Sequence, residues 1–285
     1  MKHKFIRIIA FALTASLFAA CGDGGSDQKQ KLENFEEEKQ SDKSFNPDDV
    51  ERTRTVVFPS AHEIMTVFKN AGLKYKPDVT NDVANKSNYN TRFQKALAVG
   101  FYTSGLAYHV IHNQSAEAPE YLKVILELSS EIGISGVSAD DELVQNFENS
   151  MGDEEKMLEI MSDIQSETDA YIADNDMQDW QMLIFSGAWL EGMYIGVKAN
   201  DSYNTGDLSR RISEQMSILE NQISVLESTD LQGEDFDSYM NSLKELEELY
   251  NSYPEVQNAE GVPKLGVNQL KEISDQIKTL RNSLI

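Results

Sequence analysis

The chain has 285 residues, a formal net charge of −23 at pH 7 and a single cysteine. A surface this acidic repels nucleic-acid phosphates, and one cysteine excludes both a disulfide framework and a thiolate metal site. The sequence also lacks the motifs of nucleotide-binding loops, serine-hydrolase elbows and zinc proteases. We therefore expect no nucleic-acid partner, no metal and no cofactor, and an enzyme is less favoured than a binding or interaction protein.

The first residues predict an export signal. Residues 1–20 join a basic start to a short apolar run and two alanines, directly before Cys21. The apolar run is shorter than the roughly 20 residues that a membrane-spanning helix needs. The stretch LFAAC is typical of a bacterial lipoprotein signal, although Phe18 replaces the usual aliphatic residue. We expect lipid on Cys21 to anchor the chain to a membrane. The alternative is an ordinary signal peptide in which this cysteine has no role.

Residues 21–54 predict an acidic tether that begins at the lipidated cysteine. They are rich in charge, glycine and serine and poor in aliphatic side chains, a composition typical of flexible segments. A coil of this length spans about 30 Å. Removal of residues 1–20 takes away three positive charges and no negative ones, which leaves −26. We expect an exported protein, lipid-anchored to the outer membrane in its periplasmic or surface-facing leaflet, whose body stands clear of the acidic headgroups.

Residues 55–285 predict a single all-helical domain. Ser60 and Glu63 have the spacing of a helix capping box. Helical periodicity follows almost throughout, and a strand pattern is confined to TRTVVF near residue 55. Three apolar stripes stand out: 157–171, 208–226, and a last one whose members, three or four residues apart, are Leu270, Ile273, Ile277, Leu280 and Leu284. The fold class we expect is an all-α multi-helix bundle of eight or nine helices.

Two segments of this domain resemble each other. FQKALAVGFYTSGLAYHVIHN (93–113) aligns without gaps to WQMLIFSGAWLEGMYIGVKAN (180–200). The identical pairs are Gln94 and Gln181, Gly100 and Gly187, Gly105 and Gly192, Val110 and Val197, and Asn113 and Asn200. Similarity at a fixed offset is the signature of a repeated unit. We therefore predict an internal duplication of one central helix.

The same segments are almost free of charge. Residues 96–111 contain no Asp, Glu, Lys or Arg, and residues 182–197 contain only Glu191. A helix that is apolar on every side is buried, and glycine lets a neighbouring backbone come close to it. The alternative, a pair of transmembrane spans, is disfavoured because both runs are short. The sequence therefore predicts two central buried helices that contain glycine.

Several segments together resemble one family. The resemblance rests on the lipoprotein signal, FPSAHEIMTVFKNAGLKY, YNTRFQKALAVGFYTSGLAYHVIHNQ, EIGISG and WQMLIFSGAWLEGMYIG. These segments are similar to a family of exported helical lipoproteins of unknown function from Gram-negative bacteria. The resemblance covers roughly residues 55–200 and is weaker beyond them. It implies a helical fold and brings no established activity.

Six side chains of the central helices are candidates for a ligand pocket. A carboxylate within an apolar helix must be paired, hydrogen-bonded or protonated, and this makes Glu191 the sharpest candidate. The other five are an aromatic group and one histidine: Tyr102, Tyr108, His109, Trp189 and Tyr194. The competing interpretation is that the aromatic residues form core and that the carboxylate is satisfied by a polar neighbour.

Two further patterns are weaker. His109 and His112 lie three residues apart on one helical face, yet further metal ligands are missing from the pattern, so structural roles are favoured. The acidic turn at 174–179, DNDMQD, lacks the glycine and the distant glutamate of an EF-hand. We expect it to cap the following helix and not to hold calcium.

These observations favour a lipid-anchored cell-envelope protein that serves as a helical interaction or accessory module with an envelope protein partner. An exposed apolar patch would support this function. The alternative is a small-molecule binding lipoprotein with a pocket between the central helices. A third hypothesis is an enzyme that uses Glu191 and a histidine, and it requires both side chains in one solvent-reachable cleft.

Overall fold

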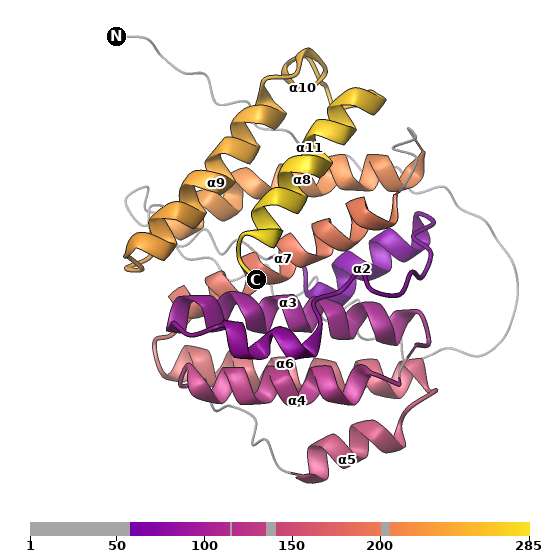
Figure 1. Ribbon diagram of the computed structural model, residues 1–285, viewed down its shortest axis with the longest axis vertical. Coiled ribbons are helices and arrows are strands. Elements are labelled where there is room, and N and C mark those ends of the chain that lie inside the picture. Colours follow the sequence, from indigo (N-terminus) through magenta and orange to yellow (C-terminus); the bar gives the residue numbers. More distant parts are fainter. Residues whose placement is uncertain (1–57, 115, 135–140, 201–205) are drawn as a thin grey trace, which may run out of the picture. The chain divides into compact units, whose positions relative to one another are not determined.

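The computed structural model describes residues 58–114, 116–134, 141–200 and 206–285, and this part of the chain contains no strand (Figure 1). Its helices are α2 (Ala61–Asn70), the 3-10 helix η2 (Val83–Asn88), α3 (Arg92–Ile111), α4 (Ala118–Glu131), α5 (Asp141–Asn149), α6 (Glu154–Asp174), α7 (Gln178–Ala199), α8 (Asp207–Glu227), α9 (Glu234–Asn251), α10 (Pro254–Gln257) and α11 (Val267–Asn282). The prediction of an all-α multi-helix bundle is confirmed. The two elements beyond the expected number are the short η2 and α10, which leave no periodic pattern.

The N-terminal predictions fall on residues that the structure does not describe. The signal at 1–20, the lipidated Cys21, the tether at 21–54 and its boundary with the domain at 54/55 all lie outside the described residues. They therefore stay predictions.

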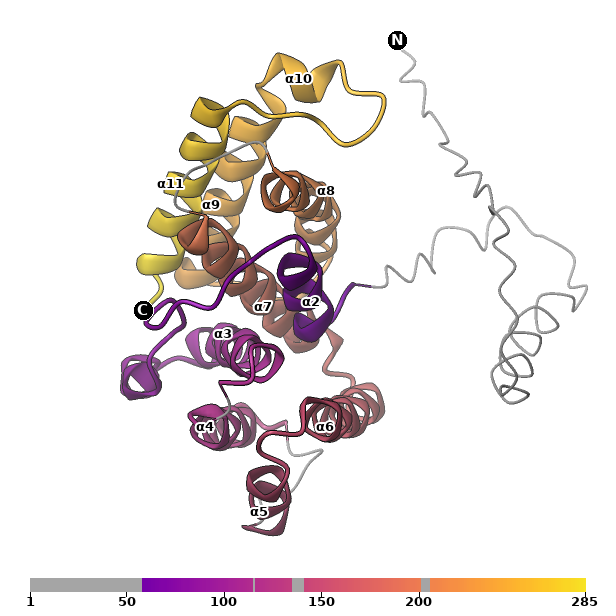
Figure 2. The same ribbon diagram turned by 90° about the vertical axis from the view of Figure 1, so that its right-hand side faces the viewer.

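The central helices are α3 and α7. They pack against each other more extensively than any other pair of described helices, and nearly all of their side chains beyond the first turns are buried. Figure 2 shows α4 beyond α3 on one side, and α8, α9 and α11 beyond α7 on the other. α2 packs on both central helices. The prediction of two central buried helices is confirmed.

The matched glycines meet where α3 and α7 touch. A Cβ added to Gly100 would clash with the backbone of Ile184 and Ala188, and it would lie 2.8 Å from the carbonyl carbon of Gly187. A Cβ added to Gly187 would clash in turn with the carbonyl oxygen of Leu97 and lie 3.0 Å from its Cα. Ile184 and Leu97 are themselves matched positions of the two segments, so the contact is reciprocal, as it is across a two-fold axis. This is the geometry that a duplicated helix packed on its copy would give.

The second matched pair serves different neighbours. A Cβ on Gly105 would come within 2.5 Å of the Tyr121 ring on α4, whereas one on Gly192 would lie 3.1 Å from the side-chain ends of Ile64 and Met65 on α2. Each central helix therefore uses this glycine to admit a different outer helix. The surroundings of the two segments have diverged even though the glycines match.

The outer helices are amphipathic, as their periodicity predicts. The capping box of Ser60 and Glu63 opens α2. The expected stripes of α8 and α11 are buried, apart from their partly buried end residues Leu208 and Leu284. In α6 only Met157 and Ile172 are buried, and Ile160, Met161, Ile164 and Tyr171 of its stripe are half-buried. No described helix is both long and apolar enough to cross a membrane.

The acidic turn does not cap α7, so that prediction is wrong. The N-cap is Met177, whose side chain makes no capping bond. The Asp179 carboxylate lies within the first turn, where it suits the positive end of the helix dipole. It also accepts a hydrogen bond of 2.9 Å from the Asp230 backbone N–H. The turn is therefore tied to the α8–α9 connection.

Candidate functional site

A buried ion pair satisfies Glu191, the one charged residue of the apolar run 182–197 in α7. The Arg281 Nε–H donates to Glu191 Oε2 at 2.7 Å, and its Nη2–H donates to Oε1 at 2.9 Å. The two side chains are 8% and 0% exposed, respectively. The guanidinium carbon also lies 4.2 Å from the centre of the Tyr194 ring. This bidentate pair joins α11 to the central helix, which is the structural role that the competing interpretation of Glu191 predicted.

Sequence reasoning missed Arg281. It lies 90 residues beyond its partner, and charged residues at the end of a helix usually face solvent. One feature of the sequence could have identified it. Arg281 directly follows Leu280, a member of the last apolar stripe, and that stripe had to pack on the core. The burial of that stripe carries the arginine inward with it.

The candidate aromatic residues of α7 point to separate neighbours. Trp189 is fully buried, and its indole N–H donates to the Gln215 backbone carbonyl of α8 at 3.3 Å. Tyr194 lies beside the buried ion pair and accepts a hydrogen bond of 3.0 Å from Lys198. These two side chains therefore serve the α7–α8 and α7–α11 contacts.

The candidate residues of α3 meet a different structure. Residues 73–82, here called the strap, run from α2 to η2 across the C-terminal half of α3. Tyr108 OH accepts a 2.6 Å hydrogen bond from the Lys76 backbone N–H, and Tyr102 OH donates to the Asp82 carbonyl at 3.1 Å. His109 Nε2 lies 3.4 Å from the Thr80 hydroxyl. These three side chains therefore hold the strap on the helix.

Taken together, the six candidate residues are buried and do not line an opening in the described part of the chain. Between their two groups the backbones of α3 and α7 touch at Gly100 and Gly187. The ligand-pocket prediction stays a prediction, and it requires packed helices to separate. Glu191 and His109 share no solvent-reachable cleft, because the first is sealed under α11 and the second under the strap. The hypothesis of an enzyme that uses Glu191 and a histidine therefore stays a hypothesis, and for His109 it requires these covers to open.

Buried tyrosine hydroxyls give the fold a sensitivity to alkali. Burial raises the pKa of Tyr89, Tyr121 and Tyr250 to about 12. Above pH 10 the unfolded chain loses these protons first, so stability should fall as the pH rises, by about 1.4 kcal/mol per tyrosine for each pH unit up to 12. Urea titrations at stepped pH, with tyrosinate absorbance as a second readout, measure this. The expectation fails if all eleven tyrosines ionise together near pH 10 in a chain that stays folded.

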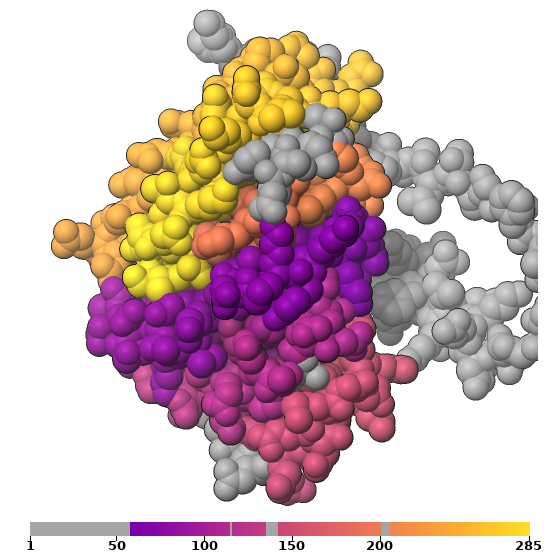
Figure 3. Space-filling view, turned by 45° about the vertical axis from the view of Figure 1, so that its right-hand side comes forward, coloured from indigo at the N-terminus to yellow at the C-terminus, as the bar shows by residue number. Residues whose placement is uncertain are grey.

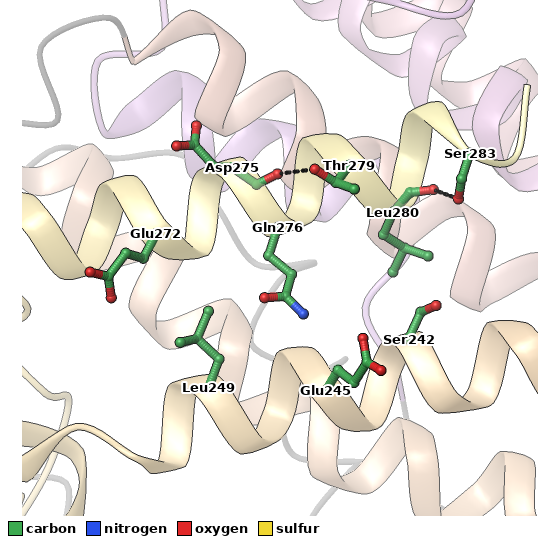
Figure 4. A pocket seen from close by; sticks show the side chains of 9 residues that line it. All are labelled: Ser242, Glu245, Leu249, Glu272, Asp275, Gln276, Thr279, Leu280 and Ser283. Atoms are coloured by element: carbon green, nitrogen blue, oxygen red, sulfur yellow. Dashed lines mark hydrogen bonds between the residues drawn. The ribbon is translucent and has the colours of Figure 1, made fainter.

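Two hollows on the described surface flank α9. One groove of about 490 Å³ runs between α9 and α11 (Figure 4), and a smaller one of about 290 Å³ runs between α8 and α9. The first is lined by Ser242, Glu245, Leu249, Glu272, Asp275, Gln276, Thr279, Leu280 and Ser283. The second is lined by Glu220, Ile223, Ser224, Glu227, Lys244, Glu247 and Glu248. Seven carboxylates thus lie along the two sides of one helix.

These carboxylates repel one another. Partial burial, followed by the negative charges of Glu220, Glu227 and Glu248, raises the pKa of Glu247 above its ordinary value. Lys244 offsets part of this charge through a 2.6 Å ion pair with Glu227. In the described residues no group of three or more His, Cys, Asp or Glu side chains is arranged to hold a metal ion. α9 (Glu234–Asn251) and the carboxylates of the two grooves beside it are here called the α9 ridge, and their excess negative charge faces solvent.

Large hydrophobic side chains are scarce on the described surface. Those that are exposed are Met151, Val262 and Val267. The face drawn in Figure 3 runs from α10 and α11 at one end, past α2, to the α4–α5 end. The sequence prediction looked for an apolar patch as the mark of a protein partner. Charge and groove shape, and not a broad apolar patch, are the features that this surface offers for recognition.

Comparisons with protein-family models, with curated proteins and with solved structures find no match to this chain. The resemblance to exported lipoproteins therefore stays a prediction that rests on the quoted segments.

Proposed function

We propose that this chain is a lipid-anchored interaction module of the cell envelope, whose α9 ridge binds a basic segment of an envelope protein. The observation that carries the proposal is the pair of acidic grooves on either side of α9. Seven carboxylates line these grooves, which can accept the long side chains of lysine and arginine. Opposite charge across an interface speeds encounter and selects the partner.

The groove between α9 and α11 fits this role best. Figure 4 shows Glu245 pointing up from α9 and Gln276 pointing down from α11 between the two helices, with Glu272 and Asp275 farther along α11. Leu249 and Leu280 supply an apolar floor. Lysine and arginine have apolar stems and charged heads, so such a floor with an acidic rim suits them.

The anchor and tether support the same function. Cys21, as the lipidated residue, holds the chain at the outer membrane, and the acidic tether keeps the helical body off the headgroups. With the predicted tether between anchor and body, the body can search for a partner in the same membrane. The interaction gains from this confinement without any added contact.

Charge reversal tests the proposal. The lipidated chain is crosslinked in its own membranes and recovered, with Glu245→Lys/Asp275→Lys as the groove variant. Two reversals in the groove should reduce recovery of the crosslinked partner about tenfold, because like charges then face each other. Glu159→Lys/Glu167→Lys on α6 is the matched control, since it changes the same net charge at exposed positions away from the grooves.

Three outcomes contradict the proposal. One is recovery of the chain alone from native membranes. Another is equal loss of partner in the groove and control variants, which would indicate bulk charge and not a site. The third concerns the anchor: Cys21→Ser should release the chain from membranes, and a variant that stays bound would reject lipidation at this residue.

A further inference from the structure

The strap covers two histidines at the C-terminal end of α3. His109 is 3% exposed, and its Nδ1 has no hydrogen-bond partner. His112, one helical turn on, is half-buried and has a buried Nε2 without a partner. Buried polar atoms of this kind are rare and usually mark a strained or functional place.

A chain of hydrogen bonds ties the first histidine to the strap. Tyr121 OH donates to the Asn81 carbonyl at 2.9 Å and lies 2.7 Å from Thr80 Oγ1. Since the tyrosine proton is used on Asn81, the threonine donates to the tyrosine and its oxygen accepts from His109 Nε2–H at 3.4 Å. The network therefore assigns the neutral tautomer with a bare Nδ1. Outside this chain of bonds, the Gln114 backbone and Glu117 favour a second proton on the ring, but burial outweighs them.

Aromatic rings close the remaining sides. The Tyr75 ring of the strap stacks on Tyr108 with centroids 5.5 Å apart, and it lies 6.1 Å from the His109 ring and 5.9 Å from the His112 ring. The His109 ring lies 5.0 Å from Tyr121 on α4. The strap is thus held over two imidazoles by aromatic contacts and tyrosine hydroxyls.

We propose that the strap is an acid-released cover, which leaves the end of α3 when His109 and His112 take up protons. Two imidazolium ions would then lie on one helical turn, beside the ammonium of Lys69. That ammonium is held there by the Ile111 carbonyl and by a 3.3 Å ion pair with Glu154. Release exposes Tyr75, Tyr108 and Tyr121 together with both charged rings.

The charged groups around the pair favour release. Burial lowers the pKa of His109 from its ordinary value, and it outweighs the opposing effects of Glu117 and of the Gln114 backbone. Glu117 lies 3.7 Å from Nε2, but its side chain is 70% exposed, so solvent screens the attraction. Burial also lowers the pKa of His112. The positive charges of Lys69 and His109 lower this pKa further, and the negative charge of Glu154 opposes them. The strap itself carries the charged side chains of Lys74, Lys76, Asp78 and Asp82. The neighbouring Tyr75, Tyr108 and Tyr121 stay neutral in acid.

The depressed pKa of each imidazole determines how the stability of the cover depends on pH. The covered state binds protons more weakly than the open one, so the cover is stable above the ordinary histidine pKa of about 6.5. It is lost as the pH falls through and below that value. Each histidine multiplies the opening equilibrium by up to about tenfold per pH unit in this window.

Hydrogen exchange of the full chain at pH 7.5 and at pH 4.5, corrected for intrinsic rates, tests the cover. Residues 73–82 should lose protection by more than tenfold at the lower pH while α8 and α9 keep theirs. His109→Gln/His112→Gln should abolish this difference, because glutamine does not titrate. His62→Gln is the matched control and should keep it, since His62 lies on α2 and is bonded to Thr66.

Several results would overturn the proposal. Strap protection could be equal at both pH values, or it could vanish only together with that of α8 and α9, which would be global unfolding. If the double variant fails to fold, proton NMR of the wild-type imidazoles decides. The midpoint of strap opening must then coincide with the titration of His109 and His112, and a different midpoint rejects the cover.

Discussion

Replacing Arg281 with methionine should destabilise the folded chain by about 3–5 kcal/mol, because it leaves the Glu191 carboxylate buried without a partner. The loss is large against a total stability of about 5–15 kcal/mol for an ordinary domain. It should appear as a lower urea midpoint with an unchanged slope. Lys271→Met is the matched control, since Lys271 is exposed on the same helix.

A double variant separates the charge from the packing. Glu191→Leu/Arg281→Met removes both charges and fills the site with apolar side chains, so most of the lost stability should return. If Arg281→Met costs no more than Lys271→Met, the pair does not hold α11 on the core. If the double variant is as unstable as the single one, lost packing and not an orphaned charge explains the effect.

Gly100→Ala and Gly187→Ala should each destabilise the chain by about 3 kcal/mol or more, at or above the upper end of ordinary overpacking. The added methyl group meets backbone on the facing helix, which no rotamer change can relieve. The gain of about 1 kcal/mol in helix propensity does not offset this clash. Thermal or urea unfolding gives the value.

Gly192→Ala is the matched control for the glycine contact. Its methyl group meets no backbone, only the Ile64 Cγ2 methyl group and the flexible end of Met65, both at 3.1 Å. We expect a change near zero, since the propensity gain and the small repacking cost oppose each other. Equal effects at Gly192 and Gly187 would show that the helices are not held at backbone contact.

The spacing of apolar residues predicted the helices and which of them are most deeply buried. The uncharged runs around Gly100 and Gly187 identified the two central helices, because nothing but burial explains an apolar surface on all sides. The stripe of α6 was a weaker guide. Its period indicated a helix, but four of the five apolar side chains of the stripe remain partly exposed, since few neighbours pack on it.

Contacts between residues far apart in the chain were not predicted from the sequence. The Glu191–Arg281 pair spans 90 residues, and the strap over His109 depends on backbone groups of Lys76 and Asn81, which no side-chain pattern records. The candidate residues were correct as interior positions of the central helices. Their division among α8, α11 and the strap could not be predicted, because it follows from which outer element covers which face.

The buried ion pair also has a consequence in time. A ribosome releases Glu191 well before it releases Arg281, so the central helices of an incomplete chain contain a carboxylate that nothing neutralises. The desolvation penalty keeps that helix from settling against its neighbours until the last helix arrives. The domain can therefore become compact only after α11 has been synthesised. A chain that ends before α11 should be loosely packed and sensitive to proteases, and not a shorter stable bundle.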